Sequence, residues 1–208
     1  MAFPVFFLAI SAVASFSAVS SNYVDAESRQ VILDIHNNLR SEIARGVFMA
    51  NTTRKPPATN MLKMKWNETL EASAVAWAKN LSVACRLVHS GSGENLFSHW
   101  SSIEIVDKMQ PVHTSSKHWA SEFNKGWNGT YYQSGRGHAT QMAWATTDSI
   151  GCAYGMCSPN SQIVVCQYWP YGNIVSRPVY TDGPTCSQCP KGYVCEEKTG
   201  LCVAETDC

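Results

Sequence analysis

The sequence feature that most constrains the fold is a pair of β-patterned runs that follow a glycine-flanked histidine. The runs cover residues 149–156 and 162–169, and the turn Cys157-Ser-Pro-Asn separates them. Short apolar runs bounded by turn residues are typical of strands paired in a hairpin. His138 stands upstream, directly after the run Gly135-Arg136-Gly137. We therefore predict a hairpin scaffold that holds the His138 side chain in a fixed place.

Three segments, residues 25–45, 67–85 and 114–125, carry the apolar spacing of helices. His36 and Arg40 lie in the first helix, where we expect a polar side with packing duties. In the same helix, apolar residues recur at steps of four. This spacing predicts one buried face made of Val31, Ile35, Leu39 and Ile43.

The segments between the helices give weaker signals. Residues 87–89 are predicted as a short β-like run, and residues 101–108 as a short helix. Cys85 ends the second predicted helix on its apolar face. We expect its sulfur to point towards the core, where a disulfide would pin the helix to a sheet.

The first twenty residues indicate export. They hold no charged side chain, and their apolar stretch is too short for a membrane span. Ala18-Val19-Ser20 has the small residues of a cleavage site, so we predict a signal peptide over residues 1–20. No later apolar run is long enough for a membrane span. The mature protein is therefore expected to be soluble, secreted and extracellular.

Charge and cysteine content narrow the class of protein further. Lys plus Arg and Asp plus Glu both number 16, so nothing marks a nucleic-acid partner. Nine cysteines in an exported chain predict disulfides. Four sequons also predict N-linked glycans, at Asn51, Asn67, Asn80 and Asn128.

Four motifs, in order along the chain, resemble those of the CAP superfamily, also called the sperm-coating protein (SCP) family. The two longer motifs are Gly137-His138-x-Thr140-Gln141-Met142-x-Trp144 and Cys166-Gln167-Tyr168-x-Pro170-x-Gly172-Asn173, and the shorter ones are His36-Asn37-x-Leu39-Arg40 and Gly93-Glu94-Asn95-Leu96. Ala139 and Ala145 depart from the residues usual in the first motif. The cysteine-rich tail makes the chain most similar to the activation-associated secreted proteins of parasitic nematodes.

The resemblance implies an α+β fold. It is a three-layer α–β–α sandwich with a central, mostly antiparallel sheet and helices on both faces. The CAP/SCP domain is expected over residues 21–176. A small disulfide-rich extension is expected over residues 177–208, where five cysteines crowd a stretch that has no periodic apolar pattern.

The resemblance also implies two disulfides, Cys85–Cys157 and Cys152–Cys166. Each would stabilise the fold by roughly 2–4 kcal/mol. Pairing in the tail stays open among Cys186, Cys189, Cys195 and Cys202, and one arrangement is Cys186–Cys195 with Cys189–Cys202. Four pairs leave one cysteine of nine. We assign it to Cys208, either unpaired or bridging a homodimer.

Members of the family share an open cleft with two histidines and two glutamates, and the matching residues here are His89, Glu94, Glu122 and His138. His89 and Glu94 can also face one another on residue grounds, because a glycine-rich turn separates them. Glu122 lies at the edge of a predicted helix face, where a carboxylate is ordinarily solvated.

Three kinds of chemistry fit these four residues. His89 and His138 suit reversible binding of Zn²⁺ or another divalent cation, with Glu94 and Glu122 beside them, and no cofactor is required. Acid/base hydrolysis is the second, but Ser90 should point to the opposite face of a strand from His89. A purely structural role, in which the pairs hold four segments together, is the third.

A different class of function is binding of sterols or fatty acids. The resemblance implies a lipid site near the loop of residues 124–133, which is rich in Trp and Tyr. A glycan on Asn128 would obstruct such docking, and a packed Ω-loop is the alternative.

We therefore expect a venom-allergen-like protein that binds or modulates a partner in a host. A hydrolase and a lipid-binding protein are the alternatives. Whether the protein is an enzyme stays open, and the lack of a nucleophile motif disfavours catalysis. The partner, an extracellular protein or a lipid, cannot be named from the sequence.

Overall fold

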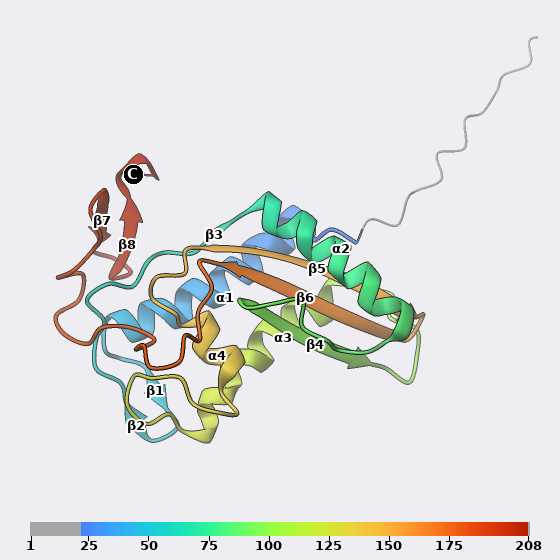
Figure 1. Cartoon of the computed structure of the whole chain (residues 1–208), viewed down its shortest axis with the longest axis horizontal. Helices are drawn as coiled ribbons and strands as arrows, with labels where there is room; N and C mark the ends of the chain where they lie inside the picture. The colour runs from blue at the N-terminus through green and yellow to red at the C-terminus, as the bar shows by residue number, and fades with distance from the viewer. Residues whose placement is uncertain (1–21, 208) are drawn as a thin grey trace, which may run out of the picture.

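The computed structural model describes residues 22–207, and its centre is a four-stranded sheet (Figure 1). The strand order is β3-β5-β6-β4, and all neighbours are antiparallel except β3 and β5, which are parallel. The bounds are β3 Lys65–Trp66, β4 Glu94–Trp100, β5 Ser149–Ser158 and β6 Ser161–Trp169. The predicted hairpin is therefore confirmed as β5 and β6.

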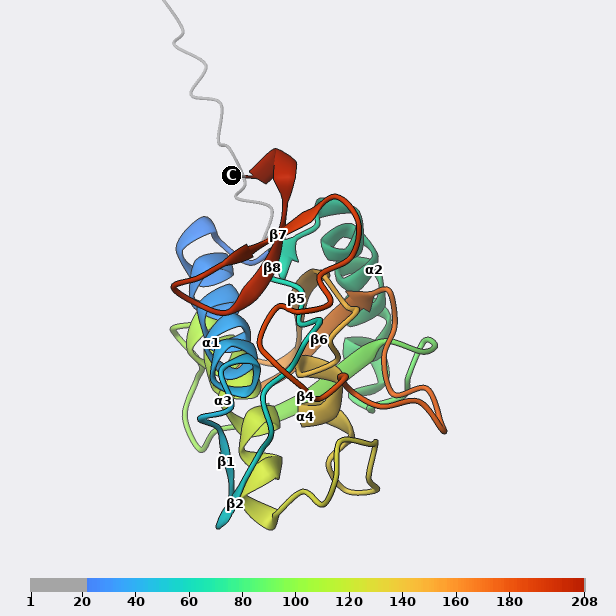
Figure 2. The same cartoon turned by 90° about the vertical axis from the view of Figure 1, so that its left-hand side faces the viewer.

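Helices cover both faces of this sheet, which makes the three-layer sandwich that was expected (Figure 2). One face carries α2, Glu68–Ala84. The other carries α1, Ala26–Ala44, with α3, Met109–Ala120, and the short α4, Gly137–Met142. The remaining elements are β1 Met49–Ala50, β2 Thr53–Arg54, β7 Tyr193–Glu196, β8 Leu201–Ala204 and the 3₁₀ turns η1 Ser121–Lys125 and η2 Glu205–Asp207.

The alternation of side chains along β6 divides the apolar residues into two cores. Ile163 and Val165 pack with α2 in a smaller core. Val164, Cys166 and Tyr168 point to the other face and join the larger core under α1 and α3. Helices cover both faces of the sheet, so side chains on both sides of β5 and β6 are buried. The sequences of these two strands are therefore nearly continuous apolar runs.

Two glycines of β5 allow α2 to lie very close to the sheet. A Cβ at Gly151 would stand 2.1 Å from the amide nitrogen of Glu71, and one at Gly155 would stand 2.4 Å from the carbonyl oxygen of Ala78. Any side chain at these positions would push the helix away. The glycines therefore set the spacing between two layers.

The buried face of α1 differs from the predicted one. Ile32, His36, Leu39 and Ile43 are buried, whereas Val31 and Ile35 are only partly buried. A strict step of four drifts around a helix of 3.6 residues per turn, and the observed spacing of four, three and four follows the true period. The prediction was wrong by about one position at the start of the helix.

The predicted helix over residues 114–125 is also displaced. α3 begins at Met109, so residues 101–108 are irregular and not helical. Pro111 fits in the first turn, where its missing N–H has no intrahelical partner to lose. The Asp107 carboxylate accepts hydrogen bonds from the amides of Met109 and Gln110 at that end.

The stretch after α2 corrects two further expectations. Residues 87–89 form no strand, and Cys85 is exposed in a left-handed conformation that ends the helix. The structure contains the disulfides Cys85–Cys157, Cys152–Cys166, Cys186–Cys195 and Cys189–Cys202. The second joins directly opposed residues of β5 and β6.

The tail packs onto the rest of the protein. Val179, Tyr180 and Leu201 are fully buried members of the larger core. The amide of Cys202 donates to the carbonyl of Met61, which ties β8 to the chain before β3. The segment after residue 177 therefore shares the core of the segment before it.

Two predictions lie outside the described residues: the signal peptide over residues 1–20 and the unpaired or bridging role of Cys208. Within residues 22–207, no helix combines the length and the apolar character that a membrane crossing demands.

Candidate functional site

All four predicted cleft residues line one open hollow of about 330 Å³. They come from the loop after α2, the start of β4, η1 and the start of α4. The structure arranges them as two pairs, His138 with Glu122 and His89 with Glu94. The rest of the lining includes Asn95, Tyr132, Gly135, Gly137 and Asn173.

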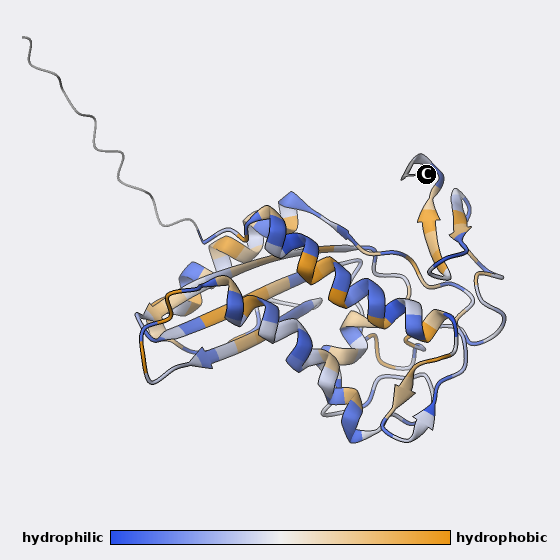
Figure 3. Ribbon diagram, turned by 180° about the vertical axis from the view of Figure 1, so that it is seen from behind, coloured by the Kyte–Doolittle hydropathy of each residue, from blue (hydrophilic) through white to orange (hydrophobic). Residues whose placement is uncertain are grey.

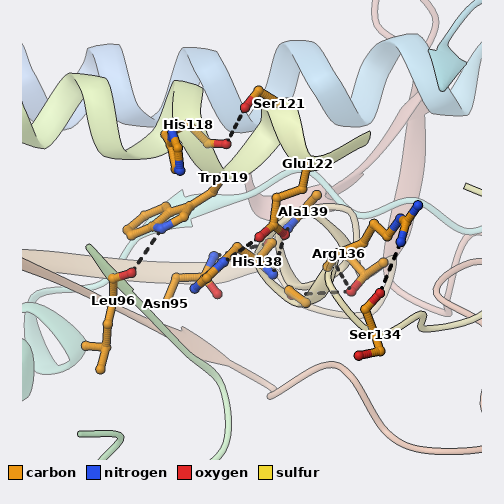
Figure 4. Close-up of polar contacts among 12 residues, drawn as sticks. Asn95, Leu96, His118, Trp119, Ser121, Glu122, Ser134, Arg136, His138 and Ala139 are labelled. Atoms are coloured by element: carbon orange, nitrogen blue, oxygen red, sulfur yellow. Dashed lines mark hydrogen bonds and ion pairs between the residues drawn. The ribbon is translucent and has the colours of Figure 1, made fainter. Parts of the chain in front are cut away.

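The His138–Glu122 pair is held by several hydrogen bonds (Figure 4). The imidazole Nδ1 lies 2.8 Å from one carboxylate oxygen, and the other oxygen accepts from the amides of His138 and Ala139. The imidazole also stacks on Trp119, with ring centroids 6.0 Å apart. These contacts leave the ring little freedom to turn.

The pKa of Glu122 reflects this setting. Burial alone would raise it, but the hydrogen bonds from the His138 side chain and from the Ala139 and His138 amides outweigh burial. The net effect lowers the pKa below its ordinary value. The carboxylate therefore stays ionised and keeps accepting the His138 hydrogen bond at neutral pH.

The His89–Glu94 pair is built on the loop after α2. His89 Nδ1 lies 3.1 Å from one carboxylate oxygen of Glu94, and this oxygen also accepts from the amide of Ser90. The other oxygen accepts from the Ser90 hydroxyl at 2.6 Å and from the Gln167 amide at 3.2 Å. The His89 side chain is 55% exposed, against 35% for His138.

The position of Ser90 corrects an expectation. Its side chain lies in the same cluster as His89, because residues 87–89 are a loop and do not alternate between two faces. The hydroxyl donates to the carboxylate, however, and not to an imidazole. Nucleophilic catalysis by serine requires a base to accept that proton, usually the histidine. This order of contacts is not that of a catalytic triad.

Gly93 is the residue that brings the loop back onto the sheet. Its φ of +72° lies in the left-handed region. A Cβ there would stand 2.8 Å from the carbonyl oxygen of Tyr168 and 2.7 Å from Cβ of Tyr171. Only glycine combines that backbone angle with that close approach.

The two pairs share one chemical consequence. Each Nδ1 faces a carboxylate and carries the hydrogen, so Nε2 holds the lone pair of the neutral ring. Within residues 22–207, no hydrogen bond reaches Nε2 of His89 or His138. Both lone pairs are therefore available in the cleft.

The glutamates, in contrast, are already engaged. Every carboxylate oxygen of Glu94 and Glu122 accepts at least one hydrogen bond from the protein. They orient the imidazoles, as carboxylates behind metal-binding histidines do. In the described part of the chain, the cleft offers no set of three ligand atoms within 4.8 Å of one another. The set that meets this spacing is the sulfurs of Cys186, Cys189 and Cys202, and each is in a disulfide.

A chain of buried polar residues supports the cleft from below. The amide of Asn95 donates to the His138 carbonyl and to the Tyr168 hydroxyl, both at 3.2 Å. The Tyr168 hydroxyl lies 2.9 Å from His36 Nε2, and His36 Nδ1 bonds the Ile32 carbonyl. The sequence motifs contained His36, Asn95, His138 and Tyr168, but their separation along the chain hid the connection between them.

Trp127, in the loop before α4, is packed into the core, whereas Tyr131 and Tyr132 of the same loop are exposed. Trp127 is 1% exposed and stacks on Phe123 with ring centroids 4.5 Å apart. The Lys55 ammonium donates to the carbonyls of Trp127 and Gly129 from beneath. Trp127 is thus part of the core and presents no surface to a lipid, while Asn128 is exposed.

Comparison with known proteins agrees with this architecture. The sequence model of the cysteine-rich secretory protein family (CAP) matches residues 33–168. The Ancylostoma secreted protein of Ancylostoma caninum is 36% identical over 195 residues, which cover 85% of this chain and 44% of that protein. The chain thus spans less than half the length of this relative, and 36% of bovine peptidase inhibitor 16.

Two solved structures match over nearly their whole length. NaASP2, whose structure is described as determined with Zn²⁺, is 34% identical with a TM-score of 0.75, over 88% of this chain and 98% of that one. BmVAL-1 is 33% identical with a TM-score of 0.77, over 88% and 96%. With the family motifs, the sandwich and the two His–Glu pairs in place, this chain belongs to the cysteine-rich secretory protein (CAP) family.

Proposed function

We propose that this protein is secreted and acts outside the cell as a binding protein that modulates a host, and that its cleft binds a divalent cation reversibly. The observation that carries the metal proposal is the orientation of the two imidazoles. Both direct Nδ1 to a carboxylate and leave Nε2 to the cleft. Neutral imidazole nitrogens of this kind are the commonest protein ligands of Zn²⁺ and related ions.

The donor set indicates weak and exchangeable binding. Two imidazole ligands leave at least two positions of a tetrahedral ion to water or to a partner. Glu94 and Glu122 would orient the ligands and make them more basic. The relative NaASP2, described with Zn²⁺ at 34% identity, supports this assignment.

The same geometry favours binding over catalysis. The Ser90 hydroxyl donates to the Glu94 carboxylate and not to an imidazole, so the serine–histidine pair typical of a nucleophilic hydrolase is not formed. Secretion and a role in a host rest on the predicted signal peptide, the four disulfides and the similarity to the Ancylostoma secreted protein.

Calorimetric titration with Zn²⁺ tests the metal site. We expect His138→Ala and His89→Ala each to weaken binding by about tenfold or more, and the double variant to abolish it. His118→Ala removes an exposed histidine outside the cleft and should leave the affinity unchanged. Unchanged affinity in the double variant would refute the site and assign both histidines to a structural role.

A further inference from the structure

The edge strand β4 ends on the side of the sandwich away from the β7–β8 hairpin (Figures 1 and 3). β4 is the last strand of the sheet, so one of its edges has no partner strand. Trp100 ends β4 and is 68% exposed, and Ile103 and Val106 follow at 74% and 84%. Together with Ser98 and Glu104 they form what we call the β4 edge surface. Grouped exposed apolar side chains commonly mark an interaction site.

The hydrogen-bond phase of β4 fixes which main-chain groups face outward. The amide of Tyr168 donates to the carbonyl of Gly93, so that pair faces inward between β4 and β6. Alternate residues of an antiparallel strand face opposite edges, so Leu96, Ser98 and Trp100 direct N–H and C=O away from the sheet. The indole of Trp119 covers the Leu96 carbonyl.

Unlike the Leu96 carbonyl, the outward main-chain groups of Ser98 and Trp100 form no hydrogen bond within residues 22–207. Sheet edges are usually blunted by lysine, proline or a covering segment, and neither Ser98 nor Trp100 supplies such a device. An extended peptide that adds a strand uses such free donors and acceptors.

A hollow of about 310 Å³ lies beside this edge and sets the side-chain chemistry. Ile103, Ile105 and Val106 give it apolar walls, and the carboxylates of Glu104 and Asp107 are the acidic groups of its rim. The remaining lining residues are His99, Ser101 and Gln110. The Asp107 carboxylate is engaged at the start of α3. Glu104 is exposed and forms no ion pair with any described residue.

We propose that the β4 edge surface binds an extended segment of a partner protein in which apolar and basic residues alternate. The segment would pair with the main chain of Ser98 and Trp100, place an apolar side chain in the hollow and set a basic one against Glu104. A second copy of this chain fits less well, because a symmetric pair brings the same acidic rim against itself. None of the four sequons falls within residues 94–110, so no predicted glycan is attached to this surface.

A labelled eight-residue peptide of alternating Val and Lys, followed by fluorescence anisotropy, tests the proposal. We expect the protein to bind this peptide and not its Val–Glu counterpart. Trp100→Ala should weaken binding by about tenfold, and Glu104→Lys should reverse the preference between the two peptides. Val83→Ser, which changes a residue 89% exposed on α2, is the matched control and should bind as the parent does.

Two further measurements separate the alternatives. Ser98→Pro removes one outward donor at an edge position, where proline is tolerated, and should weaken binding while the melting temperature stays close to that of the parent. The double variant His89→Ala/His138→Ala should bind the peptide normally, so loss of the metal site does not affect this test. Equal binding by all variants would refute the proposal. Self-association of the parent that Trp100→Ala abolishes would assign the surface to a second copy and overturn the proposal likewise.

Discussion

His36 and His138 stand in two motifs of the same family, yet the fold gives them opposite roles. His36 is fully buried, and both ring nitrogens bond protein atoms, the Ile32 carbonyl and the Tyr168 hydroxyl. His138 bonds Glu122 through one nitrogen and leaves the other to the cleft. A histidine with both nitrogens engaged can only hold the structure together, whereas one with a free lone pair can bind a ligand.

Arg40, one helical turn after His36, extends the contrast. Its guanidinium is fully buried, forms no ion pair with a carboxylate of residues 22–207, and donates to five carbonyl oxygens, those of Leu62, Met142, Trp144, Ala145 and Thr147. The planar fork joins the chain just before β3 to the chain at and just after the end of α4. The buried motif residues thus assemble the platform on which the exposed ones stand.

Arg40→Met should show the largest effect, because it leaves buried carbonyl oxygens without donors. We expect a loss of more than about 3 kcal/mol in the free energy of unfolding, measured with urea. Arg40→Lys should recover only part of that loss, since an ammonium cannot reach all five oxygens. Arg45→Met, an exposed position after the same helix, should change stability by less than about 0.5 kcal/mol. A stable Arg40→Met would break the contrast between buried and exposed motif residues.

Acid should destabilise the protein through His36. Burial is the main cause that lowers its pKa from 6.5 to about 4. The unfolded chain therefore takes up a proton below pH 6.5 that the folded protein refuses until about pH 4. The contribution of neutral His36 to the free energy of unfolding is complete above pH 6.5 and is lost as the pH falls from 6.5 to about 4. The total loss is about 3 kcal/mol.

Urea unfolding between about pH 7 and about pH 4 measures this dependence. His36→Gln disturbs two buried hydrogen bonds, so its stability should be lower than that of the parent at neutral pH. Because glutamine takes up no proton, this stability should fall less steeply with acid. The same steepness in His36→Gln and the parent would contradict the assignment. His118→Gln, at an exposed position outside the cleft, is the matched control for replacing a histidine by glutamine.

Glu122→Gln and Glu94→Gln compare the two halves of the cleft. Each change weakens the acceptor behind one imidazole, so we expect Zn²⁺ affinity to fall by about tenfold to a hundredfold, with little loss of stability. The effect should be larger for Glu122, whose partner imidazole is the less exposed one, 35% for His138 against 55% for His89. Glu104→Gln, at an exposed position beyond the end of β4 and outside the cleft, is the control. Unchanged affinity in both cleft variants would show that the carboxylates do not orient the ligands.

Lys55→Met should give the smallest effect and tests burial outside the family motifs. Burial lowers the pKa of Lys55, whose ammonium also lies 4.5 Å from the ring centre of Trp127. The change removes two hydrogen bonds but also the cost of burying a charge, so we expect a net loss of about 1 kcal/mol. Hydrogen exchange of the amides in residues 127–131 should accelerate, and Lys63→Met, an exposed control, should leave them unchanged.

Much of the fold was predictable because its signals are local. The helix predicted over residues 67–85, which the structure shows as α2, and the β5–β6 hairpin follow from patterns a few residues long. The errors came where distant contacts decide. Residues 101–108 are not helical, because the amides of Ser101 and Ile105 bond the turn between β5 and β6. Ser90 joined the cleft, because Gly93 turns the loop back.

The sequence by itself determined the family, because four motifs stand in family order along the chain, and its local apolar patterns predicted the β5–β6 hairpin. The layered architecture and the four histidines and glutamates of the cleft followed from the resemblance to that family. Only the tertiary structure decided which polar atoms of these residues stay available to bind a ligand or a partner. Nε2 of His138 is open, and both nitrogens of His36 are engaged. The outward main chain of Ser98 and Trp100 is likewise visible only once β6 has bonded the other edge of β4. Availability depends on neighbours far away in the chain, and no local pattern encodes it.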